Sequence, residues 1–146
     1  MPNTKPVGVA FSDPELVAGT TITGATISGG TVSATDITTT GGLYIKTATV
    51  AAAGSNQGTA AAVSDGFTLV TAADDAKGVI LPAAVAGRTV IIKNNVSAKT
   101  LKIYPASGDA INALSANASY DIAGLTSTML VAYDETTWYS LPLVAS

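Results

Sequence analysis

The sequence predicts an all-β protein with three consecutive parts. After residue 66, short segments rich in β-branched and aromatic residues are separated by turn residues about every 8 to 12 positions. No stretch carries the spacing of three and four that marks an amphipathic helix. Between residues 20 and 40, aliphatic residues instead recur at every fifth position. We therefore expect an extended arm at 1–19, a β-repeat stalk at 20–42 and a β-sandwich or barrel at 43–146.

The stalk is predicted from four aliphatic residues, Ile22, Ile27, Val32 and Ile37, each preceded by Thr or Asp and followed by small residues. Such repeats are typical of a coiled, solenoid-like β path. Ordering the backbone costs roughly 1 to 2 kcal/mol per residue, whereas each buried Ile or Val returns only about 1.5 to 3 kcal/mol. We therefore expect these residues to mediate oligomerisation or to lie on a partner. A disordered linker is the alternative, but a linker has no reason to keep the spacing.

The arm carries apolar residues on a segment without a core of its own. We expect six of them to anchor the arm in a partner's surface: Pro6, Val7, Val9, Phe11, Pro14 and Leu16. A frayed terminus is the alternative interpretation of the same residues.

The third part is predicted to contain nine strands, and residues 51–64 are left as a connection. The expected strands are 43–50, 67–71, 79–81, 88–93, 100–104, 110–114, 119–122, 128–133 and 137–141. We expect 88–93 and 100–104 to form one hairpin, and the last two strands to form another around residues 134–136. The acidic pairs at 74–75 and 134–135 lie in predicted turns. There Asp is favoured for its local hydrogen bonds, so turn formation is preferred over calcium binding.

Composition argues against several function classes. Charged residues make up 12% of the chain and the net charge is -3, so the clustered basic residues that bind nucleic acid are not expected. The chain has no histidine and no cysteine, which removes the commonest general base, thiol chemistry and most transition-metal ligands. No apolar run approaches the length of a membrane-spanning helix. We expect no catalytic residues, no metal, no cofactor and no membrane partner.

Five aromatic residues in the third part admit two interpretations. Tyr104, Tyr120, Tyr133, Trp138 and Tyr139 are expected mainly in the core and at the edges of the last strands. They are alternatively a platform for carbohydrate, in which case Trp138→Ala is expected to abolish sugar binding.

A family resemblance adds to these inferences. Residues from about 58 to 141 resemble a small β domain of tailed-bacteriophage virion proteins: head fibres, capsid decoration (cement) proteins and some tail-associated proteins. The likeness rests on GVILP (78–82), GRTVIIKNN (87–95), LKIYP (101–105), IN (111–112), ANASY (116–120) and TW (137–138). GVAFSDPEL (8–16) and the Thr-Ile-Ser-Gly repeats are similar to amino-terminal capsid-attachment segments of such fibres.

The resemblance implies a homotrimer on the outer capsid surface of the virion. Its repeats are expected to wind together and its arms to bind the major capsid protein. Four repeats make a short stalk, which favours a compact decoration protein over an adhesin that reaches the host. The alternative function is a tail-associated or receptor-binding protein whose β domain holds host surface polysaccharide. A soluble hydrolase is a third class, which the composition disfavours.

Overall fold

The structure is a computed structural model that describes residue 38 and residues 41–143. The chain divides into two units, Met1–Thr40 and Gly41–Ser146, and the fold below is that of the second. This unit is nearly all β, which confirms the predicted class. Its elements are β1 (Thr47–Ala51), η1 (Gln57–Thr59), β2 (Ala61–Ala62), β3 (Gly66–Ala72), β4 (Gly78–Ile80), β5 (Thr89–Asn94), β6 (Leu101–Tyr104), β7 (Ala110–Ile111), β8 (Tyr120–Ile122), β9 (Ser127–Ala132) and β10 (Thr137–Leu143).

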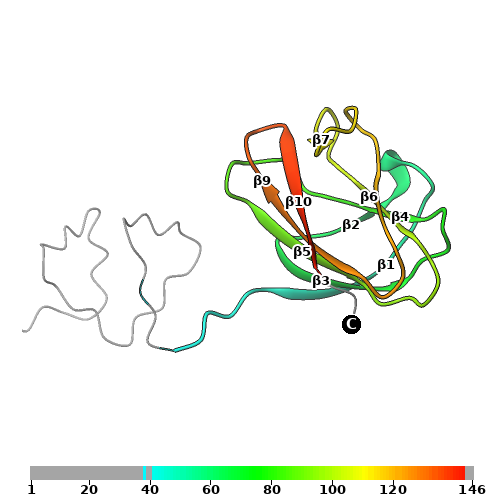
Figure 1. Cartoon of the computed structure of the whole chain (residues 1–146), viewed down its shortest axis with the longest axis horizontal. Helices are drawn as coiled ribbons and strands as arrows, with labels where there is room; N and C mark the ends of the chain where they lie inside the picture. The colour runs from blue at the N-terminus through cyan, green and yellow to red at the C-terminus, as the bar shows by residue number, and fades with distance from the viewer. Residues whose placement is uncertain (1–37, 39–40, 144–146) are drawn as a thin grey trace, which may run out of the picture. The chain divides into compact units, whose positions relative to one another are not determined.

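The strands form two sheets along a solenoid-like path (Figure 1). The six-stranded sheet has the order β1-β3-β5-β9-β10-β7, and the four-stranded sheet has the order β2-β4-β6-β8. From β1 to β6 the chain alternates between the sheets, and each strand pairs in parallel with the strand two places earlier. Parallel neighbours of this kind require a crossover, which here is a strand of the opposite sheet.

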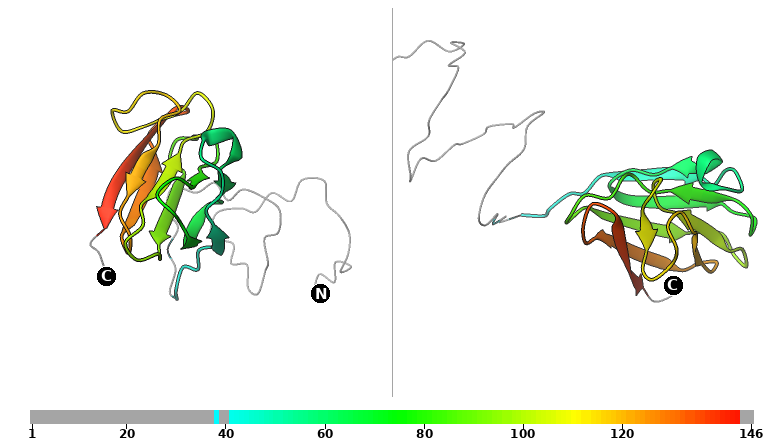
Figure 2. Two further views of the ribbon diagram at one scale, coloured as in Figure 1. Left: turned by 90° about the vertical axis from the view of Figure 1, so that its right-hand side faces the viewer. Right: turned by 90° about the horizontal axis from the view of Figure 1, so that it is seen from above.

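The last strands change the direction of pairing at one end of the solenoid. β8 pairs with β6 and β9 pairs with β5, both antiparallel, and β10 continues the sheet as the hairpin partner of β9. β7 adds in parallel to the free side of β10. At the other end, β1 and β2 are the edge strands of their sheets. Figure 2 shows the two layers from two further directions.

The core lies between the inner faces of the two sheets. Residues alternate between buried and more exposed along β5 and β9, as expected when successive side chains point to opposite faces. The largest fully buried side chain is that of Trp138 on β10. Other fully buried core residues are Val70, Val79, Val90, Ile92, Leu101, Ile103, Ile111 and Leu130.

Asn94 is a buried polar residue at the corner where the chain leaves β5. Its Nδ2 donates to the carbonyl oxygens of Lys99 at 2.7 Å and Ala123 at 3.1 Å. Its Oδ1 accepts a hydrogen bond from the backbone N–H of Val96 at 3.2 Å. Since buried polar groups need partners, this side chain ties the β5–β6 corner to the end of β8.

One strand pairing and the start of the first strand are wrong in the sequence prediction, and one pairing is confirmed. Residues 88–93 and 100–104 do not form a hairpin, because β5 and β6 belong to opposite sheets. Each has one apolar face that packs across the core, and each finds its parallel partner one coil earlier, in β3 and β4. The strand expected from residue 43 begins only at Thr47, and the connection at 51–64 contains β2 and η1. The final hairpin, β9 with β10, is present as predicted.

Candidate interaction surface

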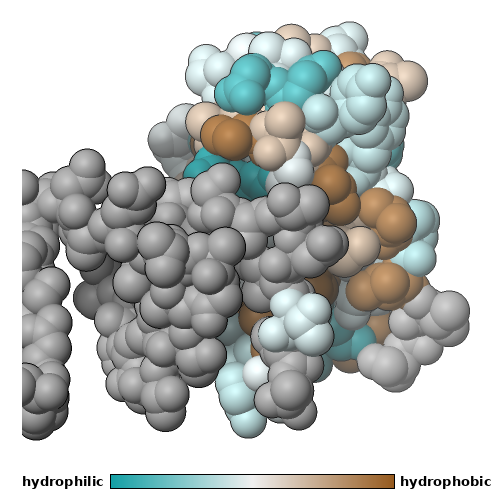
Figure 3. All heavy atoms as spheres, turned by 90° about the vertical axis from the view of Figure 1, so that its left-hand side faces the viewer, coloured by the Kyte–Doolittle hydropathy of each residue, from teal (hydrophilic) through white to brown (hydrophobic). Residues whose placement is uncertain are grey.

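The outer face of the six-stranded sheet is the most distinctive surface of the described unit. The sheet is mixed, and a sheet that packs on the core with one face usually has a polar second face, but this one carries large apolar side chains on four strands. We call the following eight residues the apolar outer face: Phe67, Leu69, Ile91, Met129, Val131, Tyr139, Leu141 and Leu143. Figure 3 shows hydrophobic residues gathered in adjoining groups on one side of the molecule. None of the eight is buried, and those on β3, β5 and β9 alternate with buried residues.

Strand register makes this surface continuous. Ile91 on β5 lies opposite Phe67 on β3 and opposite Met129 on β9. Met129 in turn lies opposite Leu141 on β10. These four side chains form an apolar row across four strands, since directly opposite residues have Cβ atoms about 4.5 to 5.5 Å apart.

Most ion pairs of the described unit lie away from the apolar outer face. On the four-stranded sheet, the Nζ of Lys102 lies 2.9 Å from a carboxylate oxygen of Asp121. In the turns before β4 and β6, Lys77 pairs with Asp74 at 2.8 Å and Lys99 pairs with Asp75 at 2.7 Å. A fourth pair, Arg88 with Asp65 at 3.1 Å, lies where β5 and β3 begin. Charges therefore lie at the edges of the apolar outer face and not among its eight residues.

Lys93 is the one charged residue on the outward side of β3, β5, β9 and β10. Its Nζ donates to the carbonyl oxygen of Leu125 at 2.7 Å, in the loop before β9. The positive charge is thus held at the border of the apolar outer face.

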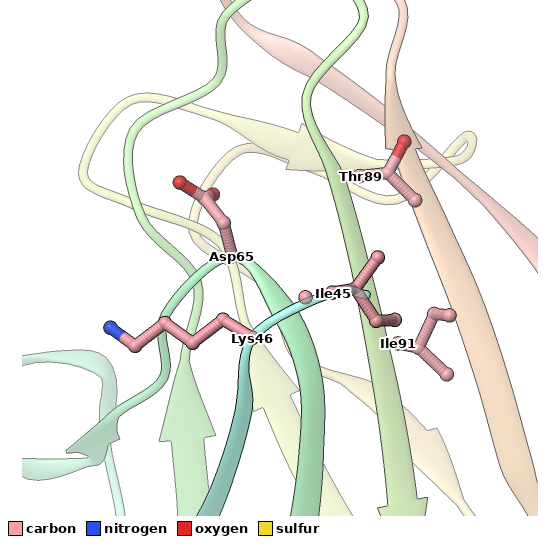
Figure 4. Close-up of a pocket in the computed structure, with 6 residues that line it drawn as sticks. Ile45, Lys46, Asp65, Thr89 and Ile91 are labelled. Atoms are coloured by element: carbon pink, nitrogen blue, oxygen red, sulfur yellow. The ribbon is translucent and has the colours of Figure 1, made fainter. Parts of the chain in front are cut away.

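A pocket of about 300 Å³ lies at one border of the apolar outer face. Its lining residues are Ile45, Lys46, Asp65, Gly66, Thr89 and Ile91. Figure 4 shows Ile45 and Ile91 side by side, with the charged ends of Lys46 and Asp65 directed away from them. A second hollow, of about 320 Å³, lies between β1 and β3 and is lined by Thr47, Ala48, Thr49, Phe67 and Leu69. The apolar outer face therefore has one hollow beside Ile91 and another at Phe67 and Leu69.

The segment before β1 adds three consecutive exposed apolar residues. Leu43 is 78% exposed, Tyr44 is 94% exposed and Ile45 is 50% exposed. The segment is held at its end, where the backbone N–H of Phe67 donates to the carbonyl oxygen of Lys46 at 2.9 Å. A large apolar side chain with almost all its surface in water is a common sign of an interaction site when its neighbours are also apolar.

Asp74 and Asp134 make the local turn hydrogen bonds that the sequence predicts, whereas Asp75 accepts a hydrogen bond from the N–H of Thr100 in another turn, at 2.8 Å. Asp74 Oδ1 accepts hydrogen bonds from the N–H groups of Ala76 and Lys77, and the hydrogen bond from the Lys77 side chain lowers the pKa of Asp74. Asp134 Oδ1 accepts from the N–H groups of Thr136 and Thr137, both at 2.8 Å. Between residues 41 and 143, no three His, Cys, Asp or Glu side chains are grouped so that they could hold a metal ion.

The aromatic residues are divided between core and surface. Trp138 is fully buried and Tyr104 is buried, which confirms the core interpretation for both. The alternative in which Trp138 contacts sugar is contradicted by its burial, because the side chain is fully buried in the core. Tyr133 and Tyr139 are exposed and meet edge to face, with ring centroids 5.8 Å apart.

The residues predicted for capsid binding and oligomerisation lie outside the described part of the chain. They are Pro6, Val7, Val9, Phe11, Pro14 and Leu16 in the arm, and Ile22, Ile27, Val32 and Ile37 in the stalk. Their roles remain predictions. In the described range, no helix has the length and apolar character needed to cross a membrane.

The apolar outer face was not foreseen from the sequence, although a signal for it is present. Residues 90–92 read Val-Ile-Ile and residues 129–132 read Met-Leu-Val-Ala, so β5 and β9 are apolar on both sides. Continuous apolar runs are typical of strands that are covered on both faces. In the sequence, these runs predict strong strands, and their apolar second face is the signal that points to a covered outer surface.

Comparisons of the chain with models of protein families, with curated proteins and with solved structures find no match in any of the three.

Proposed function

We propose that the chain is a structural protein of a tailed-bacteriophage virion, a capsid decoration protein or short head fibre. It acts by binding and performs no catalysis. Its amino-terminal arm, residues 1–19, attaches to the major capsid protein on the outer surface of the head. Its β domain, from residue 43 onward, stands outward in a homotrimer.

The observation that carries the proposal is the apolar outer face of the six-stranded sheet. A small domain that diffuses freely as a monomer gains nothing from apolar side chains across four strands, and such a face is an aggregation hazard. In a permanent assembly the same face is covered. This supports a component of an assembly, the class that the resemblance in residues 58–141 indicates.

In the proposed mechanism, many weak contacts add up to firm attachment. Apolar arm residues such as Phe11 and Leu16 fill depressions between capsid subunits. Three linked arms then bind with a high effective concentration, because the first contact holds the other arms close to their sites. A ligand that binds only the assembled shell opposes its disassembly by mass action.

The test locates the chain on particles of the phage that encodes it. Antibodies against the chain, seen by immunogold electron microscopy, are expected to label heads and not tails. In parallel, the purified full chain is mixed with heads that lack it, and binding is measured by co-sedimentation. The double variant Phe11→Ser and Leu16→Ser is expected to lose binding, whereas Thr4→Ser, a polar change in the same arm, is expected to retain it. Label confined to tails, or wild-type binding by the double variant, contradicts the proposal.

A second candidate is a tail-associated or receptor-binding protein that holds host polysaccharide. The observation in its favour is the exposed pair Tyr133 and Tyr139, since exposed aromatic rings offer apolar faces on which sugar rings stack. It predicts that Tyr133→Ala lowers binding to host surface glycans on an array, while Trp138→Phe leaves it unchanged. Tail labelling together with this glycan result favours the second candidate.

A further inference from the structure

We propose that copies of the chain associate through two patches of the β domain: residues 43–45 of one copy lie against the apolar outer face of the next copy. The inference deepens the proposed function, on whose homotrimer it rests, by naming the surfaces that meet. The contact is heterologous, because the two patches differ. Heterologous contacts close into a ring when the rotation between neighbours permits, and three copies form the smallest ring with more than one distinct neighbour.

The first argument is that both patches leave apolar side chains uncovered in a single copy, although Ile45 already lies beside Ile91 of the same copy. Tyr44 is 94% exposed and Leu43 is 78% exposed, on a segment that is not part of a strand. On the apolar outer face, Tyr139 is 49% exposed, while Leu141 and Leu143 are each 45% exposed. Covering one patch with the other removes both from water at once. Each copy supplies one of each, so in a closed ring none is left over.

The second argument comes from charge. Each copy carries a net charge of -3, so copies repel one another unless they meet where charges are few. The apolar outer face is such a place, since its eight residues are uncharged and the charges at its border, Lys93, Lys46 and the Arg88–Asp65 pair, lie around it. The ion pairs of Lys102 with Asp121 and of Lys99 with Asp75 belong to the other sheet and its turns, and stay in solvent in the proposed arrangement.

The third argument is the covalent connection to the preceding chain. Forty residues precede Gly41, and the proposed stalk at 20–42 ends beside residues 43–45. If stalks associate, residues 43–45 of one copy are brought close to the β domains of the others. The domain contact then forms at a high effective concentration. This favours a second copy of the chain over an unrelated partner as the occupant.

The size of the apolar outer face agrees with a contact that forms only at a high effective concentration. Four strands about 4.8 Å apart, each about six residues long at about 3.3 Å per residue, give a face on the order of 400 Å². Stable interfaces bury about 800 Å² on each partner. The apolar outer face alone is therefore too small for firm association, so the proposed contact needs further association elsewhere in the chain.

The experiment uses the full chain and measures how fast a single cysteine reacts with a thiol reagent. The chain has no cysteine of its own, so each variant reports one site. Leu141→Cys places the probe on the apolar outer face, and Leu114→Cys is the matched control. The two leucines are 45% and 41% exposed in one copy, and Leu114 belongs to the β7–β8 loop. Light scattering gives the mass of each sample, and circular dichroism checks its fold.

We expect the cysteine at 141 to react about tenfold more slowly than the cysteine at 114, which corresponds to a face covered roughly 90% of the time. The mass is expected near three times 14.4 kDa. Adding Leu43→Ser and Tyr44→Ser is expected to restore fast labelling at 141 without changing the rate at 114. Since these side chains are exposed in one copy, the two substitutions do not threaten the fold.

Three results overturn the inference. The cysteine at 141 reacts as fast as the one at 114, which means that the face is bare. Alternatively, it is protected in a particle with the mass of one chain, which means that the chain covers its own face. Finally, it stays protected after the serine substitutions, which means that something other than residues 43–45 covers it. Head binding is measured separately, so a chain that fails to bind heads and still shows the labelling pattern contradicts only the proposed function.

Discussion

Asn94 offers a sharp test of the fold, because its side chain makes three hydrogen bonds without any exposure to solvent. Replacing it with Ala removes two donors that reach the carbonyl oxygens of Lys99 and Ala123, and one acceptor for the N–H of Val96. Val96 and Lys99 belong to the β5–β6 loop, whereas Ala123 belongs to the β8–β9 loop, which comes much later in the sequence. The substitution therefore unties the β5–β6 corner from the end of β8.

The expected cost follows from the number of groups left without a partner. A buried donor or acceptor that loses its hydrogen bond costs about 1 to 3 kcal/mol. The carbonyl oxygen of Ala123 keeps the hydrogen bond from the Thr126 hydroxyl at 2.7 Å, so two groups lose their partner: the Lys99 carbonyl and the Val96 N–H. With two such groups at the low end, because both lie in a surface loop, Asn94→Ala is expected to lower the free energy of unfolding by about 2 kcal/mol. For a domain near this size, that corresponds to a drop in Tm of roughly 8 to 16 °C.

The assay is urea unfolding of the full chain, followed by circular dichroism, with Asn95→Ala as the control. Asn95 is the next residue in sequence and its side chain is exposed, so its replacement is expected to cost under about 0.5 kcal/mol. Asn94→Asp is expected to be worse than Asn94→Ala at neutral pH, since a carboxylate then faces two carbonyl oxygens. If Asn94→Ala and Asn95→Ala unfold at the same urea concentration, the reasoning about this corner is refuted.

Three further predictions concern the core, the acidic turns and one glycine. Trp138→Ala is expected to lower the free energy of unfolding in urea by about 3 to 5 kcal/mol. Trp138→Phe is expected to cost less, because Nε1 of Trp138 has no protein hydrogen-bond partner within the described residues. Equal losses for the two variants contradict this expectation. The backbone N–H of Thr136 lowers the pKa of Asp134 below 3.8. The ionised Asp134 carboxylate therefore stabilises the fold above pH 4, and this stabilisation is lost as pH falls through the lowered pKa. Asp134→Asn is expected to lose less stability on acidification than the wild type. In Gly66→Ala, the new Cβ meets the carbonyl oxygen of Lys46, whereas Gly87→Ala, also at positive φ, meets nothing within 4 Å. Thermal melting is therefore expected to show the larger loss for Gly66→Ala, and the reverse order refutes the close approach.

The sequence alone determined the class of the fold and most of its strands. Runs such as residues 88–93 and 128–133 are rich in β-branched and aliphatic residues, and turn residues bound them, so their local preference and their tertiary role agree. The acidic turns at 74 and 134 were likewise predictable. An Asp side chain reaches the N–H groups two and three residues ahead whatever the remainder of the chain does.

Only the tertiary structure decided which strands pair and which faces stay open. β5 and β6 are separated by a short turn and have the local signature of a hairpin, yet they lie in opposite sheets. Burial of the inner faces of β5 and β6 in the core stabilises the fold more than a local hairpin between them would. This burial depends on all the strands of both sheets, so the sequence of the two strands alone does not reveal it. The same holds for Ile91 and Leu141. The sequence shows that both residues are apolar. Only the register across β3, β5, β9 and β10 brings them together into one outward surface.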